Sequence, residues 1–160
     1  MPNINYSLLK DYLVFNGVPS SVTYYVNHWE GLGISSESTS TGSPYGTLYN
    51  PGNVINFNTL AVNFVIDENW IVFEEIFNLL YKNAPLEADD YERTIFDIDL
   101  HLMSNTYKKE IGYIRMYSGY VQDIMNVTHD YNASDNTIVN ILQCTIKYQY
   151  HKFFRADVDE

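Results

Sequence analysis

The chain has 160 residues and a mass of 18.6 kDa, which is the size of one domain with a single hydrophobic core. Nine Lys and Arg residues against twenty Asp and Glu residues give a formal net charge of −11, which argues against a nucleic-acid-binding surface because phosphate contacts need clustered basic side chains. The chain has a single cysteine, Cys144, which excludes an internal disulfide. It has no run of about 18 apolar residues, so the sequence predicts no membrane-spanning helix.

The first part of the chain is predicted to hold a terminal arm and a strand. Residues 1–21 carry scattered apolar side chains and lack the basic start and continuous apolar core of a signal peptide, so we expect an arm on a protein made and used inside a cell. Residues 22–28, VTYYVNH, are typical of a strand, bounded by Gly31 and Gly33 on the far side.

The segment 35–52 is rich in Ser, Thr, Gly and Pro, and Glu37 is its only charged residue. Segments this long without structure are uncommon inside a compact domain and are usually functional or disordered. A disordered linker should join two domains, and residues 1–32 are too few to form one. We therefore expect a long loop that becomes ordered against another subunit.

An alternating segment then changes into a helical one. Leu60, Val62, Phe64 and Ile66 lie two apart, as on the buried face of a strand. Asp67 stands at the expected N-cap of a helix that ends before Pro85. The side chains predicted to face the core from this helix recur at spacings of three and four, and they are Trp70, Phe73, Phe77 and Leu80, in a stripe that Ile76 and Leu79 widen.

Three further strands are predicted in the second half of the chain. Residues 94–102 alternate between an apolar and a polar face, and residues 111–124 form a strand with a bulge or bend at Gly119. Residues 137–154 are the longest strand candidate, and Cys144 lies in its apolar register as a buried thiol. The segment between the last two predicted strands is rich in Asn and Asp, which predicts a turn that joins them as an antiparallel hairpin.

The order of these elements predicts the fold class. Several strands with one helix, and no alternating β-α-β pattern, favour a mainly β domain: an antiparallel β-sandwich or barrel with one packed α-helix. Residues 1–160 are expected to form this single domain, with residues 155–160 as a solvated acidic tail.

The sequence offers little catalytic chemistry. Asp97, Asp99 and His101 share one face of a strand, but ligands on a single straight strand cannot surround a metal ion, so a solvated strand face is the better interpretation. The adjacent Asp89 and Asp90 lie in an acidic connection and are better explained as surface charge than as an acid–base pair. We predict no catalytic, cofactor-binding or metal-binding residues, and the chain is not expected to be an enzyme.

In the order of its features the chain resembles the tail-tube proteins of contractile-tail, myovirus-type bacteriophages. The resemblance covers most of residues 22–154. The segment Ile66-Asp67-Glu68-Asn69, followed by an aromatic-rich helix, is similar to the family's Val-Asp-Glu-Asn pattern, and Pro51-Gly52 matches a common Pro-Gly turn. Gly31-Leu32-Gly33-Ile34 departs from the family's Leu-Pro-Gly-Ile turn by lacking the proline.

The resemblance implies a structural virion protein without cofactors, assembled in the host cytoplasm. Six copies would form a ring, the rings would stack into a tube inside the sheath and above the baseplate, and DNA would pass through without specific binding. No membrane binding is implied. The side chains expected to make the ring-stacking contacts lie in the long loop, and they are Ser35, Ser43, Pro44, Tyr45, Tyr49, Pro51 and Gly52.

An acidic lumen would repel DNA phosphates and let the DNA slide. The hypothesis for this chain is that Asp97 and Asp99 help line the lumen, and an outward solvated face is an equally good explanation of the same pattern. Three alternatives stay open: a baseplate-proximal or tail-completion ring, the tube of a secretion system, and a small acidic ligand-binding or hydrolytic β-domain. The last predicts a stable monomer with an apolar pocket.

Overall fold

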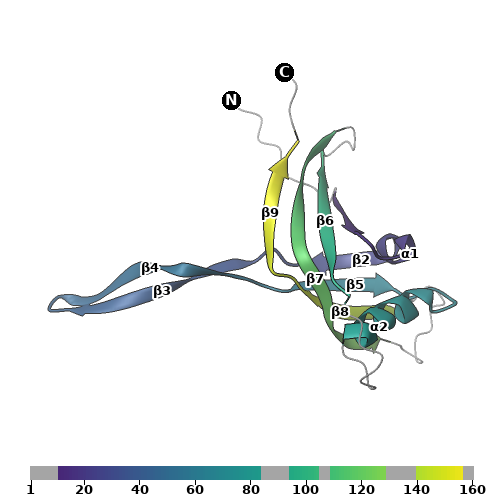
Figure 1. Cartoon of the computed structure of the whole chain (residues 1–160), viewed down its shortest axis with the longest axis horizontal. Coiled ribbons are helices and arrows are strands. Elements are labelled where there is room, and N and C mark those ends of the chain that lie inside the picture. Colours follow the sequence, from purple (N-terminus) through teal and green to yellow (C-terminus); the bar gives the residue numbers. More distant parts are fainter. Residues whose placement is uncertain (1–10, 84–93, 105–108, 129–139, 157–160) are drawn as a thin grey trace, which may run out of the picture.

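The computed structural model describes residues 11–83, 94–104, 109–128 and 140–156, and Figure 1 shows their arrangement. In chain order the elements are β1 (Asp11–Phe15), α1 (Ser20–Tyr24), β2 (Val26–Glu30), β3 (Ile34–Ser43), β4 (Gly46–Phe57), β5 (Leu60–Val65), α2 (Ile71–Asn83), β6 (Phe96–Met103), β7 (Glu110–Thr128), β8 (Ile141–Lys147) and β9 (Tyr150–Arg155).

Seven strands form one antiparallel sheet in the order β1-β6-β7-β8-β5-β2, with β9 also paired to β7, while β3 and β4 form a separate hairpin. The mainly β, antiparallel fold class is thereby confirmed. Neither helix within the described ranges is long and apolar enough to cross a membrane.

Strand β7 takes part in two layers. Its first half pairs with β6 and β9, and its second half pairs with β8. We call β1, β6, β9 and the first half of β7 layer A, and we call β2, β5, β8 and the second half of β7 layer B. In Figure 1 the strands of layer A stand upright and those of layer B run across them.

The change of direction in β7 occurs at a bulge. Phe96 pairs with Gly119 but Ile98 pairs with Met116, so two residues of β7 lie opposite the single residue Asp97 of β6, and β7 has one extra residue. Ser118 there has a φ of 54°, and its backbone N–H donates a hydrogen bond of 3.0 Å to Oδ1 of Asp97. The structure thus has a bulge beside Gly119, as the sequence analysis expected.

The core fills the space between the two layers and α2. The apolar alternation of β5 buries Leu60, Val62 and Phe64, and the alternation of β8 buries Leu142, Cys144 and Ile146, as predicted. Layer A contributes further buried side chains from β1 and β6, namely Leu13, Phe15, Phe96, Ile98 and Leu100. Cys144 is therefore a buried thiol in the middle of the core.

Three predicted boundaries near the ends of the chain need correction. Part of the expected arm, residues 11–15, is strand β1 of layer A because Leu13 and Phe15 reach the core. The strand expected at 22–28 starts only at Val26, since α1 begins directly after Pro19 and buries Val22. At the other end, Arg155 still pairs with Gly112 and is not part of a solvated tail.

The long segment expected as a loop is instead the hairpin β3–β4. Its Ser-rich and Thr-rich composition suggested irregular structure, but the backbone pairs almost continuously from Ile34 and Phe57 to Ser43 and Gly46. Residues 137–139 of the predicted strand at 137–154 lie outside the described residues, and the rest forms two strands, β8 and β9, separated by Tyr148 and Gln149.

The face that α2 presents to the core was predicted only in part. The helix begins at Ile71, not directly after Asp67, because residues 67–70 form a turn in which Trp70 has a φ of 58°. Oδ1 of Asp67 accepts a hydrogen bond of 3.1 Å from the backbone N–H of Val72. Asp67 therefore still provides an acceptor for one of the first backbone N–H groups of the helix, which have no partner within the helix.

The buried residues of α2 are Val72, Ile76 and Leu79. Of the predicted core residues, Phe73 and Leu80 are partly buried, whereas Trp70 is 43% exposed and Phe77 is 47% exposed. The aromatic side chains of this helix therefore lie mostly on its outer flank.

This assignment predicts different costs for neighbouring substitutions on α2. Ile76→Ala should lower the free energy of unfolding by about 2–4 kcal/mol because it leaves a cavity in the core. Phe77→Ala should cost less than about 1 kcal/mol because nearly half of the side chain is already in solvent. Urea unfolding of the two variants and the wild type measures both values, and an equal or larger loss for Phe77→Ala would contradict the assignment.

Candidate assembly surfaces

The hairpin β3–β4 projects from the body of the molecule (Figure 1). Pro44 and Tyr45 form its two-residue turn between the paired residues Ser43 and Gly46. Oγ of Ser43 donates a hydrogen bond of 2.7 Å to the carbonyl oxygen of Gly46, and the backbone N–H of Tyr45 donates one of 3.3 Å to the same Oγ. Gly46 has a φ of 128°, which a residue with a side chain rarely adopts.

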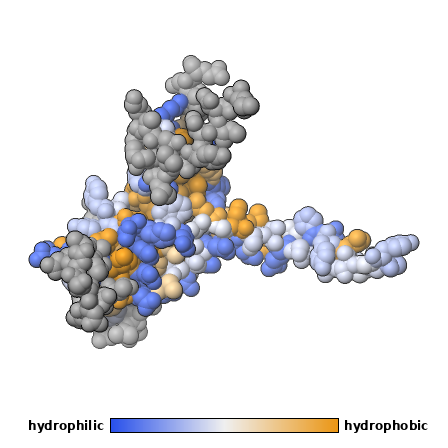
Figure 2. Space-filling model, turned by 180° about the vertical axis from the view of Figure 1, so that it is seen from behind, coloured by the Kyte–Doolittle hydropathy of each residue, from blue (hydrophilic) through white to orange (hydrophobic). Residues whose placement is uncertain are grey.

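The surface of the hairpin is almost uncharged and carries exposed apolar and tyrosine side chains among its Ser and Thr residues. Tyr45 is 100% exposed and Tyr49 is 74% exposed. Other exposed apolar side chains of the hairpin are Ile34, Leu48, Val54 and Ile55. Figure 2 shows hydrophobic groups in orange along it. A lone two-stranded ribbon is at best marginally stable in water, so this hairpin is suited to packing against a second surface.

The seven side chains predicted to make ring-stacking contacts all lie on this hairpin. Ser43 and Gly52 are partly buried, and the other five are exposed: Ser35, Pro44, Tyr45, Tyr49 and Pro51. Gly52 has a special place, because the register shifts between Ser36 and Ser38 and the backbone of Gly52 is pressed against that of Glu37. A Cβ atom at Gly52 would lie 1.7 Å from the carbonyl oxygen of Glu37, so only glycine fits.

The outer face of layer A carries a row of stacked rings. The ring of His101 lies 4.8 Å from that of Tyr12 and 5.8 Å from that of Tyr113, and the rings of Tyr113 and Phe154 lie 5.0 Å apart. These residues come from β1, β6, β7 and β9 and are direct cross-strand partners. The sequence analysis did not find this row, because it depends on the register of strands far apart in the chain.

Beside this row, Asp99 forms an ion pair with Arg115, its cross-strand partner on β7. Oδ1 of Asp99 accepts from Nε of Arg115 at 2.7 Å, and Oδ2 accepts from Nη2 at 3.0 Å and from Nδ2 of Asn16 at 3.0 Å. Only 6% of Asp99 is exposed. Burial alone would raise the pKa of the Asp99 carboxyl, but the hydrogen bonds from Arg115 and Asn16 and the charge of Arg115 outweigh it and hold the pKa below its ordinary value.

The three residues considered as cation ligands do not converge. Asp97 accepts from the backbone of Ser118, Asp99 is bound to Arg115, and Nδ1 of His101 lies 2.6 Å from a carboxylate oxygen of Glu110. No cluster of three or more potential metal ligands occurs in the described part of the chain. The prediction of a solvated strand face is corrected at Asp99, since its partner on β7 removes it from water.

The ion pair predicts a specific pH dependence. At neutral pH, Asp99→Asn should lower the free energy of unfolding by about 1–2 kcal/mol, a value reduced by the partial exposure of Arg115. Because the folded-state pKa of Asp99 is depressed, its contribution is complete above a pH of about 4 and is lost as the pH falls through the folded pKa. Urea unfolding of wild type and variant from about pH 7 down to about pH 3, a range that crosses the ordinary carboxyl pKa, measures the difference in the free energy of unfolding.

The difference between the two curves should shrink on the acid side. Asp123→Asn, at an exposed position of β7, is the matched control and should follow the wild-type curve. A constant difference across the whole pH range would mean that the carboxylate of Asp99 is not the group responsible.

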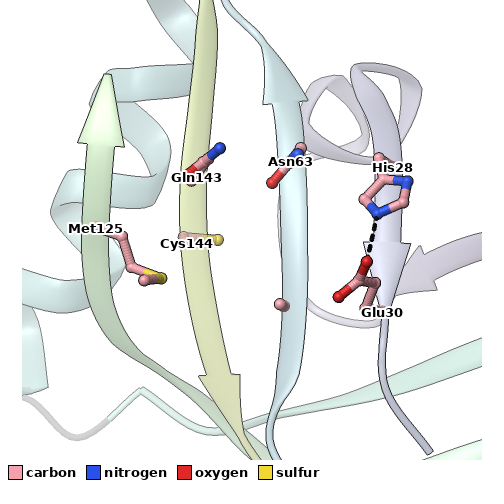
Figure 3. A pocket seen from close by; sticks show the side chains of 7 residues that line it. His28, Glu30, Asn63, Met125, Gln143 and Cys144 are labelled. Carbon is pink, nitrogen blue, oxygen red and sulfur yellow. Dashed lines mark hydrogen bonds and ion pairs between the residues drawn. The ribbon is translucent and has the colours of Figure 1, made fainter. Parts of the chain in front are cut away.

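The outer face of layer B has a small hollow of about 240 Å³, drawn in Figure 3. Seven residues from β2, β5, β7 and β8 line it: His28, Glu30, Ala61, Asn63, Met125, Gln143 and Cys144. His28 and Glu30 contact each other across 3.2 Å and are both exposed. The hollow is smaller than the roughly 300–1,000 Å³ of typical ligand sites, and its polar groups do not converge on one point, so it gives little support to a ligand-binding or hydrolytic domain.

Although Cys144 borders this hollow, its thiol is predicted to be unreactive. Burial, with a smaller effect of the charge of Asp123, raises the pKa of the Cys144 thiol to about 12, and the thiolate is the reactive form. A chromogenic disulfide reagent at neutral pH should leave the native protein unlabelled and should label one thiol per chain in denaturant. Rapid stoichiometric labelling of the native protein would contradict the buried position.

The aromatic residues of α2 form a continuous strip, which we call the aromatic strip and define as Trp70, Phe73, Phe77 and Tyr81. Successive ring centroids lie 5.5, 6.2 and 6.1 Å apart. The strip does not belong to the buried face of Val72, Ile76 and Leu79. Its four members are themselves uncharged, and the sequence analysis placed most of them in the core.

Comparison with known proteins identifies the fold. No family model and no curated protein sequence matches the chain. A chain of the PVC sheath–tube complex, from an extracellular contractile injection system, matches with a TM-score of 0.70 and 11% identity, covering 96% of this chain and 94% of that chain.

Two other solved structures match in the same way. A chain of the tube-terminating cap of the anti-feeding prophage matches with a TM-score of 0.70 and 10% identity over 98% of this chain and 95% of that chain. A mutant Hcp1 protein from E. coli matches with a TM-score of 0.51 and 8% identity over 94% of both chains. The chain thus has the tail-tube fold of contractile injection systems, which confirms the resemblance drawn from the sequence.

Proposed function

We propose that this chain is a self-assembling tube subunit of a contractile injection system, without catalytic activity of its own. The observation that carries the proposal is the combination of a tail-tube fold over nearly the whole chain with a hairpin whose apolar side chains have no cover in the single subunit. Six copies would form a ring, and rings would stack through the hairpin into a tube enclosed by a sheath and attached to a baseplate.

The edges of layer B support ring formation. Among the described residues, β2 pairs only with β5, and the second half of β7 pairs only with β8. Unpaired backbone groups therefore lie on both sides of this layer, and copies can join edge to edge around a closed ring. A closed ring leaves no free strand edge.

Within this class, we propose a tube of a contractile phage tail that conducts DNA as part of the virion. The supporting observation is the net charge of −11, which disfavours adsorption of DNA phosphates to the wall. The lumen-facing position of Asp97 and Asp99 stays a prediction. Even in that position, Asp99 would add little to the negative electrostatic potential of the lumen, because Arg115 neutralises its charge within the subunit.

The structural matches favour a second candidate, the tube of an extracellular injection system, because the PVC complex is such a system. Matches to chains of a terminating cap and of a baseplate make a single terminal ring a further alternative.

Electron microscopy of the purified protein over a range of concentrations tests the proposal. Six-fold rings with a central hole are expected, and their extension into long tubes separates a polymerising subunit from a terminal ring. A compact monomer at all concentrations would overturn the proposal and favour a ligand-binding domain.

The hairpin is predicted to be needed for stacking but not for folding. Replacing residues 37–54 with an Asn-Gly turn joins the paired residues Ser36 and Ile55 directly. This variant should keep the cooperative unfolding of the body, since the core contains no residue of 37–54. It should form rings but no tubes in electron micrographs, and tubes of normal length would contradict the assigned role.

A pair of glycine substitutions gives a finer control. Gly52→Ala forces a shift of the hairpin backbone at Glu37 and should reduce tube formation, whereas a Cβ atom at Gly42 meets nothing within 4 Å. Gly42→Ala should therefore assemble like the wild type.

A further inference from the structure

The aromatic strip on α2 lies mostly outside the core, and Phe73 is its one member that packs against the buried cluster. Trp70 meets Phe73 edge to face, and the rings of Phe73, Phe77 and Tyr81 stack along the outer flank of the helix. Phe77, in the middle of the strip, is 47% exposed, and Trp70 at its start is 43% exposed. Exposed apolar area of this kind commonly marks a protein contact.

The charge of the chain restricts what can cover this strip. Glu68 and Glu74, both exposed, lie next to it along the chain, and the whole chain carries a net charge of −11. Another copy that approached the strip with its acidic surface would be repelled. A contact between copies therefore needs a segment that is both apolar and uncharged.

The tip of the hairpin is such a segment. Residues 38–57 contain no Asp, Glu, Lys, Arg or His, and Tyr45, Leu48 and Tyr49 are strongly exposed there. The row of rings on layer A is a poorer receptor, because Arg115 and Lys152 lie beside it and would have to lose water.

The positions of the two surfaces allow a contact only between different copies. The hairpin leaves one end of the long axis of the molecule, and α2 lies at the other end (Figure 1). The ten residues of β3 extend roughly 30 Å, which carries the tip well beyond its own body. A projection at one end and a receptor at the other form a heterologous contact that repeats from copy to copy.

We infer that the hairpin tip of one copy docks on the aromatic strip of a copy in the next ring. Tyr45, Leu48 and Tyr49 supply the apolar contact from the hairpin, and Phe73, Phe77 and Tyr81 receive them on α2. This inference rests on the proposed function, and it names the surface that the hairpin contacts when rings stack.

Disulfide crosslinking tests the pairing directly. The only native thiol, Cys144, is buried, so introduced cysteines report without background. A chain with Tyr49→Cys and Phe77→Cys, assembled at a protein concentration well above that needed by the wild type to offset the lost aromatic contact, should form a ladder of covalent oligomers when its tubes are mildly oxidised. The matched control combines Tyr49→Cys with Ile111→Cys, an exposed position in the first half of β7 between β6 and β9, and should give no ladder.

A second measurement uses the tubes themselves. Phe77→Ser should raise the protein concentration needed for tube formation by about tenfold or more, as expected for truncating a central aromatic contact. Asn78→Ser, at the next exposed position of α2, should leave that concentration unchanged. Circular dichroism of both variants confirms that the body is folded.

The outcomes separate this inference from the proposed function. Wild-type tubes with no ladder for the Tyr49 and Phe77 pair, and with normal assembly of Phe77→Ser, overturn the docking site and leave the tube function standing. A wild-type protein that forms neither rings nor tubes overturns both. A ladder together with impaired stacking of Phe77→Ser supports the inference.

Discussion

The continuity of β7 through both layers is the constraint on which the rest of the fold depends. A single strand pairs with β6 and β9 in its first half and with β8 in its second, so the two layers cannot move apart without breaking its ladder. The bulge at Ser118, held by the carboxylate of Asp97, turns the strand between the layers. The enclosed space between the layers is where the alternating side chains of β5, β6 and β8 meet.

Gly119 belongs to the same turn. A Cβ atom there would lie 3.1 Å from the carbonyl oxygen of Phe96 and 3.3 Å from the side chain of Ile98, so the strands approach closely at this position. The sequence indicated the bend through this glycine, whereas the role of Asp97 depends on β6 lying alongside β7. Local sequence located the irregularity, and only the pairing shows what stabilises it.

The same distinction runs through the whole chain. Strands with strict alternation, such as β5 and β6, were predictable because one buried face imposes a period of two on the sequence. The buried face of α2 was predictable only in part, because apolar residues cover more than one side of the helix: Val72, Phe73, Ile76, Phe77, Leu79 and Leu80. Periodicity cannot choose between overlapping stripes of this kind.

The candidate contact surfaces were predictable only in part. The hairpin was recognisable as an unusual, uncharged segment, but its Ser-rich strand β3 has no apolar alternation that would reveal pairing with β4. The pair of Asp99 with Arg115 and the row of rings from Tyr12 to Phe154 arise from cross-strand register, which a single sequence does not contain.

The charged residues and the apolar contact surface lie on different parts of the chain, and this determines how salt affects association between copies. Glu37 is the only charged residue of the hairpin, so −10 of the net charge of −11 resides in the rest of the chain. Dissolved salt screens repulsion between such bodies over a Debye length of roughly 8–10 Å and leaves uncharged contacts nearly unaffected. Association through the hairpin is therefore strengthened by salt, the opposite of an interface built from ion pairs, and the ionic composition of the solvent sets how readily free subunits join.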